Sequence, residues 1–476
     1  MAQAQAHSKR STKFLKDLGI YAIGNLGSKI ITFAMVPLYT FFVKDTSDFG
    51  YYDLCFTMVL LLLSPATLQL RDGAFRFLID NNDNDNRKRV ITFSYTTLLL
   101  SAIITLLITL VLYLTCDIKY VWLTYLLLMS MSFYEVISQI TRALNCKNEF
   151  VVSGILSALS IGVFSIIFVG FLSMGVIGIF LANILARIVA IAYLELKLNI
   201  SRTFFDINID YWNLGKKILK YSLPLMPGMM CWWLASSSDR FFISNYIGLE
   251  TNGIYAIAVR FTGLIYNVTT IFYMAWQDSA IIQYTKPDKD TFFSQMANTF
   301  IFFLAFLFIN YTLALKILYP YIVGENYQPS LNYVYALCIS ALFFSIAQFL
   351  DLGYQCSKET SRILPSYIMA AVVNIGLNII LIKCCGVYGA IISINAAFLL
   401  LLIYRIIDTS RYFKILIDPK SLIPISLIAL SAVPYYFINS WILNTTFIML
   451  CNIIMVILMP NTIKSQLIST ILRKKQ

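Results

Sequence analysis

The stretch Val90–Leu114, VITFSYTTLLLSAIITLLITLVLYL, contains no charged residue and is long enough to cross a lipid bilayer as one helix. Similar apolar windows recur at Phe150–Leu172, Thr291–Leu315 and Ile363–Ile382. A soluble chain of 476 residues needs a charged surface, but only 13% of these residues are charged and the mean hydropathy is +0.75. The sequence therefore predicts an all-α polytopic membrane protein.

The same pattern, followed along the chain, predicts about fourteen transmembrane helices. Their expected ranges are 18–43, 50–70, 90–114, 120–141, 150–172, 176–196, 220–246, 253–275, 291–315, 330–351, 363–383, 387–405, 421–438 and 441–460. The segment Met1–Asp17 is polar and basic, and the first apolar segment is too long for the core of a signal peptide. No cleavable signal peptide is expected.

Lysine and arginine residues predict the orientation, because basic loops stay in the cytoplasm. With a cytoplasmic N-terminus, most of the 36 basic residues fall in inner loops and tails, Arg405 among them. The predicted outer loops hold only Lys44, Lys119, Lys316 and Lys383. Both termini are therefore predicted to be cytoplasmic. The net charge of +12 fits contact with the anionic inner leaflet and requires no nucleic-acid partner.

Residues that commonly carry catalysis are scarce. The single histidine, His7, lies in the polar N-terminal tail, and most of the nine cysteines fall in apolar segments. The adjacent pair Cys384–Cys385 has neither redox nor zinc spacing. We expect no metal site and no cofactor.

Short motifs recur in the two halves of the chain. GVIGIFLANI begins at Gly175 and GVYGAIISIN at Gly386, while LNCKNE at Leu144 corresponds to YQCSKE at Tyr354. Either chance similarity or duplication produces such matches, and their common order favours duplication. We predict two pseudo-symmetric six-helix lobes around a central cavity, with two extra helices at the C-terminus. The predicted domains are 1–200, 201–410 and 411–476.

Four basic residues lie inside predicted spans, where a charge costs about 2.5–3.5 kcal/mol on the insertion scale. They are Lys29, Arg187, Arg240 and Arg260. Helical spacing places polar residues on the faces of three of them, namely Asn25, Asn183 and Asn267. Structural ion pairs are one explanation, but only Glu135 and Asp239 are clear acidic residues at comparable depth. The excess of basic residues therefore predicts an anion-binding cavity.

Four other charged residues have candidate roles around this cavity. Arg71 and Arg76 lie at the predicted cytoplasmic entrance, where they can meet an anionic substrate, although roles in topology alone would also explain them. Asp239 and Glu135 are candidates for ion coupling.

Three stretches resemble the Wzx-type polysaccharide flippases, a branch of the multidrug/oligosaccharidyl-lipid/polysaccharide (MOP) exporter superfamily. They are YAIGNLGSKIITFAMVPLYTFFVKDTSDFGYYDL (Tyr21–Leu54), TRALNCKNEF (Thr141–Phe150) and SLPLMPGMMCWWLASSSDRFFISNYIGLETNGIYAIA (Ser222–Ala258). The resemblance covers nearly all of the first 410 residues. It implies alternating-access transport of undecaprenyl-pyrophosphate-linked oligosaccharide repeat units from the cytoplasmic to the outer leaflet of a bacterial inner membrane.

The resemblance further implies a role in the synthesis of O-antigen, capsule or exopolysaccharide. The expected partners are the lipid-linked oligosaccharide and membrane lipid, with a polysaccharide polymerase and a chain-length regulator as candidates.

Two other classes of function remain as alternatives. A multidrug or cation antiporter of the same superfamily would need acidic cavity residues, whereas the charges inside these spans are mainly basic. A polysaccharide polymerase or glycosyltransferase would need a catalytic surface outside the membrane, and the longest predicted outer connection, about 316–329, is too short for one. The sequence favours a flippase that is not an enzyme.

Overall fold

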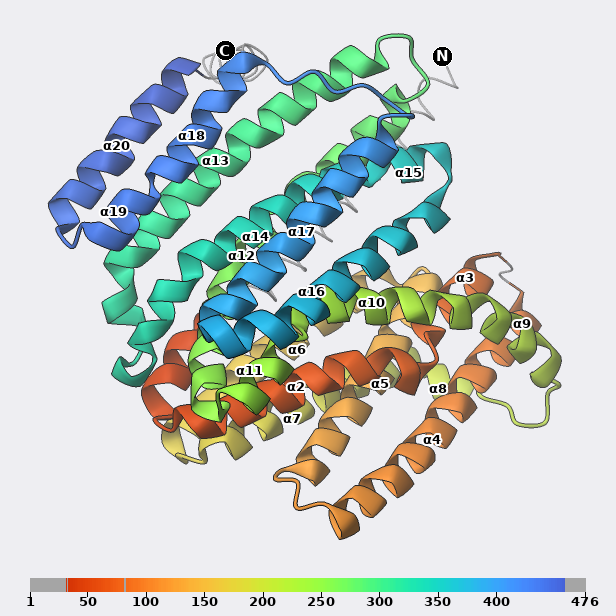
Figure 1. Ribbon diagram of the computed structural model, residues 1–476. Coiled ribbons are helices and arrows are strands. Elements are labelled where there is room, and N and C mark those ends of the chain that lie inside the picture. The colour runs from red at the N-terminus through yellow and green to blue at the C-terminus, as the bar shows by residue number, and fades with distance from the viewer. Residues whose placement is uncertain (1–30, 32, 81–82, 459–476) are drawn as a thin grey trace, which may run out of the picture. The chain divides into compact units, whose positions relative to one another are not determined.

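The computed structural model describes residues 31, 33–80 and 83–458, and all regular elements in these ranges are helices (Figure 1). Within them, 12 helices are long and apolar enough to cross a membrane, and a shorter apolar helix covers Phe33–Phe42. The prediction of an all-α polytopic membrane protein is confirmed. The first predicted span, 18–43, lies largely outside the described residues.

By its internal packing the chain divides into two compact units, Met1–Ser237 and Ser238–Gln476. The division of the chain into domains 1–200, 201–410 and 411–476 stays a prediction.

The first unit is built around α5, which packs against α2, α3, α4, α6 and α7. Leu70, Phe93 and Ile140 lie in its buried apolar core. The helices of this unit are α2 (Thr46–Thr67), α3 (Leu70–Asp80), α4 (Asn84–Thr115), α5 (Val121–Ala143), α6 (Lys147–Ser165), α7 (Gly175–Leu198), α8 (Ile200–Phe204), α9 (Trp212–Ser222) and α10 (Met226–Ser237). A π-helical turn, Ile166–Phe171, follows α6.

In the second unit α14 packs against α12, α13 and α17, and α16 and α17 form a close hairpin. Its helices are α11 (Asp239–Tyr246), α12 (Leu249–Gln283), α13 (Lys289–Ile322), α14 (Leu331–Leu350), α15 (Leu352–Ser357), α16 (Ile363–Cys385), α17 (Val387–Thr409), α18 (Leu422–Leu430), α19 (Ala432–Phe437) and α20 (Trp441–Leu458). Short 3₁₀ turns lie before α14, α16 and α18.

The predicted span 220–246 is not one continuous helix. It contains the end of α9, a 3₁₀ turn at Leu223–Leu225, then α10 and α11. Pro224 explains the first interruption, because proline lacks the N–H that a helix interior uses. The second interruption is at Ser238, after serines whose hydroxyls bond locally. Ser236 Oγ, for example, donates to the Trp233 carbonyl at 3.3 Å.

The two GVxG motifs adopt the same local structure in their respective units. Gly175 and Gly386 have φ angles of +57° and +58°, in the left-handed region that favours glycine. In the same motifs, a Cβ on Gly178 would lie 3.1 Å from the Phe168 backbone, and one on Gly389 would lie 2.2 Å from the Leu381 carbonyl oxygen. Each motif thus begins a helix, α7 or α17, that packs closely on the segment before it.

We expect Gly389→Ala to destabilise the second unit by at least about 1–3 kcal/mol, because the new methyl group would overlap backbone atoms. Gly376→Ala is the matched control, since its Cβ would meet nothing within 4 Å. Removing a glycine from that helix interior should stabilise the chain by about 0.5–1 kcal/mol. Thermal unfolding of the two purified variants checks this, and equal midpoints would contradict it.

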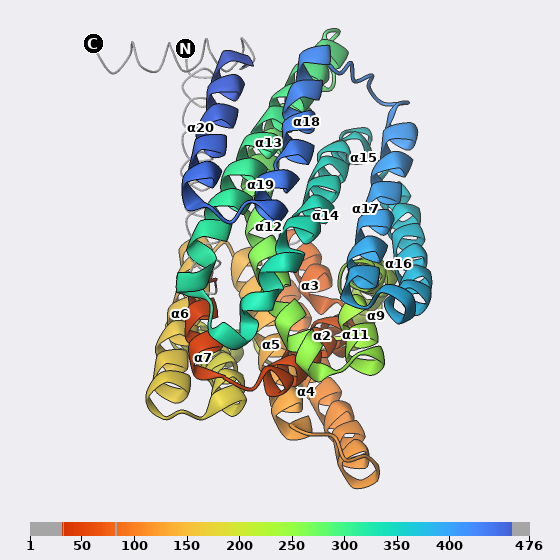
Figure 2. The ribbon, with the colours of Figure 1, turned by 60° about the vertical axis from the view of Figure 1, so that its left-hand side comes forward.

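The last three helices belong to the second unit, where α18, α19 and α20 lie beside α13 (Figures 1 and 2). The amides of Asn310 and Asn452 donate to each other at 2.9 Å. Lys316 was predicted to lie in an outer loop, and this is wrong because α13 continues to Ile322. Its ammonium donates to the carbonyl oxygens of residues 434, 435 and 438 at 3.0, 2.6 and 2.7 Å, and so fixes the end of α19.

Candidate functional site

The predicted cavity residues fall into three groups. Lys29 and Asn25 lie outside the described residues. Arg187 and Asn183 belong to the first unit, and Arg240, Arg260 and Asn267 belong to the second.

Arg187 lies near the middle of α7 and is partly exposed. Its Nη1 atom donates to Ser157 Oγ at 2.9 Å, and its guanidinium carbon lies 5.8 Å from the centroid of the Tyr134 ring. Among the carboxylates that the structure describes, none lies within ion-pair distance of this guanidinium. Among the described residues, this positive charge inside a spanning helix thus contacts a hydroxyl and a ring face.

Asn183 lies one turn before Arg187 and is 8% exposed. Its Nδ2 atom donates to the Ile179 carbonyl at 3.0 Å and to the Tyr52 hydroxyl at 3.4 Å. The Asn183 amide therefore links α7 to α2.

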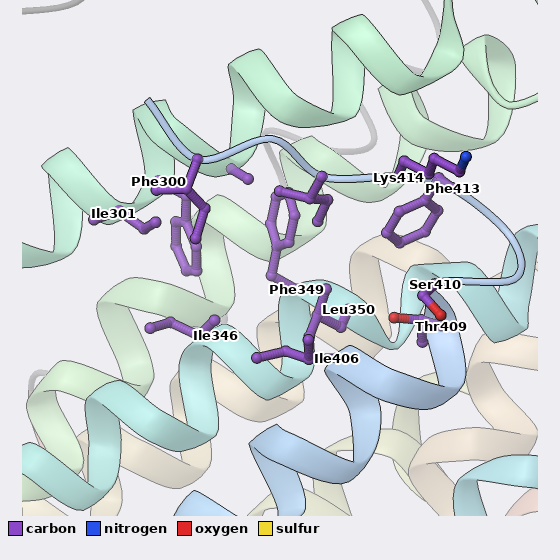
Figure 3. A pocket seen from close by; sticks show the side chains of 13 residues that line it. Phe300, Ile301, Ile346, Phe349, Leu350, Ile406, Thr409, Ser410, Phe413 and Lys414 are labelled. Carbon is purple, nitrogen blue, oxygen red and sulfur yellow. The ribbon is translucent and has the colours of Figure 1, made fainter. Parts of the chain in front are cut away.

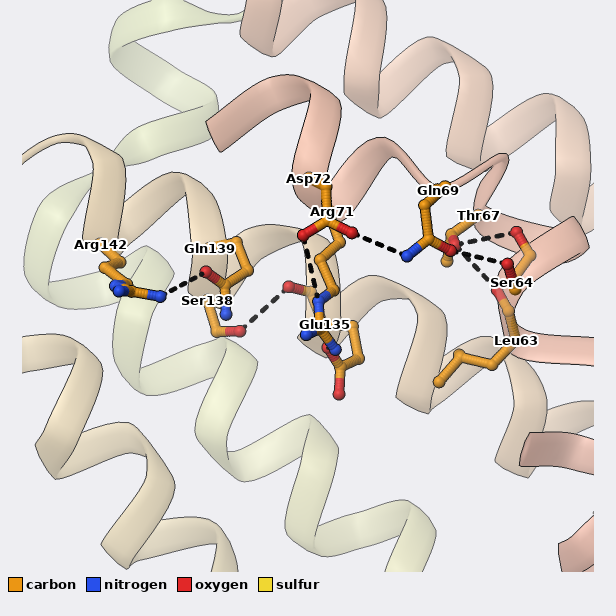
Figure 4. A network of polar contacts seen from close by, with 10 residues as sticks. All are labelled: Leu63, Ser64, Thr67, Gln69, Arg71, Asp72, Glu135, Ser138, Gln139 and Arg142. Carbon is orange, nitrogen blue, oxygen red and sulfur yellow. Dashed lines mark hydrogen bonds and ion pairs between the residues drawn. The ribbon is translucent and has the colours of Figure 1, made fainter. Parts of the chain in front are cut away.

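Arg71 and Glu135 form an ion pair between α3 and α5, with Nη1 3.1 Å from Oε2 (Figure 4). Arg71 also lies 3.7 Å from Asp72, which accepts a hydrogen bond from Gln69 at 2.7 Å. The Glu135 carboxylate acts electrostatically on Arg187 as well. The predicted entrance base Arg71 and the candidate coupling residue Glu135 are thus direct partners.

Arg76 is exposed and pairs with Asp80 one turn later on α3, at 3.1 Å. Exposed pairs of this kind contribute little stability, because water screens them. The role of Arg76 at the cytoplasmic entrance stays a prediction.

Asp239 begins α11 and is 1% exposed. The Tyr255 hydroxyl donates to its Oδ2 atom, and the Arg240 backbone N–H donates to its Oδ1 atom at 3.1 Å. A buried carboxylate whose oxygens both accept hydrogen bonds is a group that can exchange a proton or hold a cation.

Two buried asparagines of α16 extend this polar region. Asn374 Nδ2 lies 3.4 Å from Ser238 Oγ, and Asn378 Nδ2 donates to Asn374 Oδ1 at 3.3 Å. Both asparagines are fully buried, and α16 packs against α11. Neither asparagine was predicted as a site residue, although their i, i+4 spacing in an otherwise apolar span is a signal of a shared polar face.

Arg240, next to Asp239, is partly exposed. Arg260 and Asn267 are also partly exposed, and they lie two turns apart on one face of α12. Because α11 and α12 pack against each other, Arg240 and Arg260 are carried by neighbouring helices of one unit.

Arg405 was assigned to an inner loop, and this is wrong because α17 continues to Thr409. The side chain is fully buried, and its Nη1 atom lies 2.8 Å from Asp351 Oδ1. It also donates to Ser366 Oγ at 3.2 and 3.3 Å and to the Ala347 carbonyl at 3.1 Å. This arginine has all its partners within the unit and is not available to a ligand.

Comparison with known proteins gives a family and a fold. A family model described as polysaccharide biosynthesis protein matches residues 14–276, more than half of the chain. The sequence has no significant match among curated proteins.

Several solved structures have a similar fold. The lipid II flippase MurJ in an inward closed conformation aligns with a TM-score of 0.69 and 14% identity, over 94% of this chain and 99% of that one. An inward-facing multidrug resistance MATE family transporter of the MOP superfamily aligns with a TM-score of 0.62 and 16% identity, over 82% and 98%. A MOP superfamily transporter from Pyrococcus furiosus has a TM-score of 0.52 and 16% identity, over 83% and 96%. Because the sequence identities are only 14–16%, these matches show a similarity of fold.

Proposed function

Since the chain belongs to the polysaccharide biosynthesis protein family, we propose that it is a flippase for undecaprenyl-pyrophosphate-linked oligosaccharide repeat units. The family and the shared fold bear out the predicted resemblance to flippases of the MOP superfamily. The Wzx-type role is our proposal, with movement from the cytoplasmic to the outer leaflet of a bacterial inner membrane by alternating access. Both termini would be cytoplasmic.

The main support for this function is the environment of the Arg187 side chain in α7. Arg187 is a partly exposed residue of a spanning helix, and its guanidinium has a neutral hydroxyl as its described hydrogen-bond partner, so it can bind an incoming anion. A pyrophosphate suits it, because guanidinium binds phosphate oxygens through two parallel hydrogen bonds. Arg240 and Arg260 of the second unit, and Lys29 outside the described residues, stay predicted anion-binding residues.

The proposed direction agrees with the membrane potential. With the cytoplasm negative, outward movement of an anion is favoured by about 2.3 kcal/mol per charge per 100 mV. The exported units would serve the synthesis of O-antigen, capsule or exopolysaccharide, with a polysaccharide polymerase and a chain-length regulator as proposed partners.

The test uses the purified full-length protein in vesicles that contain a fluorescent pyrophosphoryl-lipid-linked oligosaccharide. We expect the protein to accelerate exposure of the fluorophore to a quencher that cannot cross the membrane. Efflux of a cationic dye without lipid flipping would favour the antiporter instead. Formation of glycosidic bonds would indicate a polymerase or glycosyltransferase.

Asp239 is proposed for ion coupling because its carboxylate is buried and accepts hydrogen bonds from Tyr255 and from the Arg240 backbone. We expect a proton or sodium gradient across the vesicle membrane to accelerate flipping by the wild type. Asp239→Asn should keep the rate measured without a gradient but lose its acceleration. The exposed loop residue Asp117 provides the control, as Asp117→Asn. An unchanged gradient response in Asp239→Asn would remove Asp239 from this role.

A further inference from the structure

An apolar pocket of about 280 Å³ lies within the second unit (Figure 3). Its walls come from α13, α14 and α17 and from the segment that follows α17. Phe300, Ile346 and Phe349 are among the apolar side chains that line it, and Lys414 is its charged residue. Neither the predicted cavity nor the ion pair of Arg405 includes these residues.

One wall of the pocket is an extended segment, 414–418, that is fastened to α13. Its alternate backbone amides, at residues 414, 416 and 418, donate to Asp290, Ser294 and Asn298 at 3.1, 2.9 and 2.9 Å. Asp290, Ser294 and Asn298 follow one another at intervals of four residues and therefore share one face of α13. Side chains of α13 accept hydrogen bonds from the backbone of this segment. These bonds fix the segment in place as one wall of the pocket.

The pocket opens on an apolar surface. Two of its lining residues, Ile406 and Ile417, are 52% and 54% exposed, as expected of side chains that face bilayer lipid. The rim also carries the exposed side chains of Ser410 and Lys414. Thr409 is 1% exposed, and the hydroxyls of Thr409 and Ser410 donate to carbonyl oxygens of α17 at 2.6 Å. In the described part of the chain, no carboxylate forms an ion pair with Lys414, whereas Arg411 pairs with Asp408.

We propose that this pocket binds one hydrocarbon chain of an anionic membrane phospholipid, whose phosphate contacts Lys414. Leaving the bilayer for an apolar pocket gives a lipid chain little hydrophobic gain, because lipid tails are as apolar as the lining. The rim must therefore provide the preference, and the exposed ammonium of Lys414 attracts an anionic head group.

A retained phospholipid fits this pocket better than transported cargo does. All the walls belong to one compact unit, and the extended wall is fixed by hydrogen bonds to α13. A site whose walls move together stays formed throughout a transport cycle. Cargo must be released in every cycle, whereas a retained lipid need not be.

The experiment measures lipid bound to the delipidated full-length protein by native mass spectrometry, after incubation with phosphatidylglycerol or phosphatidylcholine. We expect the wild type to retain phosphatidylglycerol preferentially. Lys414→Gln should bind it about fivefold more weakly, with little change in phosphatidylcholine binding. Ile346→Trp should lose the bound lipid because the ring fills the pocket. Ile380→Trp, at a lipid-facing position of α16 that is 59% exposed, should behave as the wild type.

Three outcomes would overturn the proposal. The first is equal retention of the two phospholipids by the wild type. The second is an equal effect of tryptophan at positions 346 and 380. The third is displacement of phosphatidylglycerol by an equal concentration of a prenyl pyrophosphate, which would assign the pocket to cargo. The readout is binding, so its result does not depend on whether the protein flips lipid-linked oligosaccharides.

Discussion

Replacement of Arg187 by alanine is expected to lower the rate of lipid-linked oligosaccharide flipping by about 10- to 100-fold, because hydrogen bonds to charged groups contribute about 1.5–3 kcal/mol. The variant should fold normally, since no described carboxylate loses an ion-pair partner. Arg187→Lys should be intermediate, because lysine keeps the charge but cannot form two parallel hydrogen bonds to a phosphate. The measurement is the initial flipping rate in vesicles at equal protein content.

Two controls separate binding from structure in this experiment. Ser157→Ala removes the hydroxyl that orients the guanidinium but leaves the charge, so it should have a smaller effect than Arg187→Ala. Lys217→Ala removes an exposed basic residue of α9 that belongs to none of the proposed sites, and it should flip at the wild-type rate. A wild-type rate in Arg187→Ala would refute the role of this arginine in binding.

The helical fold could be predicted from the sequence because a bilayer leaves few alternatives. A chain in hydrocarbon must satisfy its backbone hydrogen bonds internally, so long apolar windows become helices. Val90–Leu114 indeed lies within α4, and Ile363–Ile382 within α16. The ends of helices were less predictable. Charged residues such as Lys316 and Arg405 suggested loops, but both helices continue because the fold provides partners for the charges.

The candidate site could be predicted only as a set of residue types. Helical spacing places Arg187 on a face of α7, but its partners Ser157 and Tyr134 come from α6 and α5. Glu135 and Arg71 are 64 residues apart in sequence. Contacts of this kind depend on how helices pack, and the periodicity of a single helix contains no such information.

The pairing of Arg71 with Glu135 also changes the balance of charges. Glu135 and Asp239 were the two clear acidic residues available to neutralise bases within the spans. Since Glu135 pairs directly with Arg71, it acts on Arg187 only from a distance. No described carboxylate contacts the Arg187 guanidinium. The phosphate of a bound ligand would supply the missing negative charge.

The largest effect on stability is expected from separating the buried pair of Arg405 and Asp351. Arg405→Met alone should cost about 3–5 kcal/mol, because it leaves a nearly buried carboxylate without its cation. Asp351→Leu alone should cost a similar amount. The double variant, Asp351→Leu with Arg405→Met, should recover most of the loss, since apolar pairs of similar volume often replace buried ion pairs at little cost.

Thermal unfolding of the two single variants and the double variant provides the test as a double-mutant cycle. Losses that simply add in the double variant would show that the two residues stabilise the unit independently. Thermal unfolding and flipping rates together also distinguish two kinds of arginine within the spans. Arg405 is fully buried against a carboxylate, so its replacement should mainly lower the stability of the fold. Arg187 is partly exposed beside neutral partners, so its loss should lower transport while the melting midpoint stays close to that of the wild type.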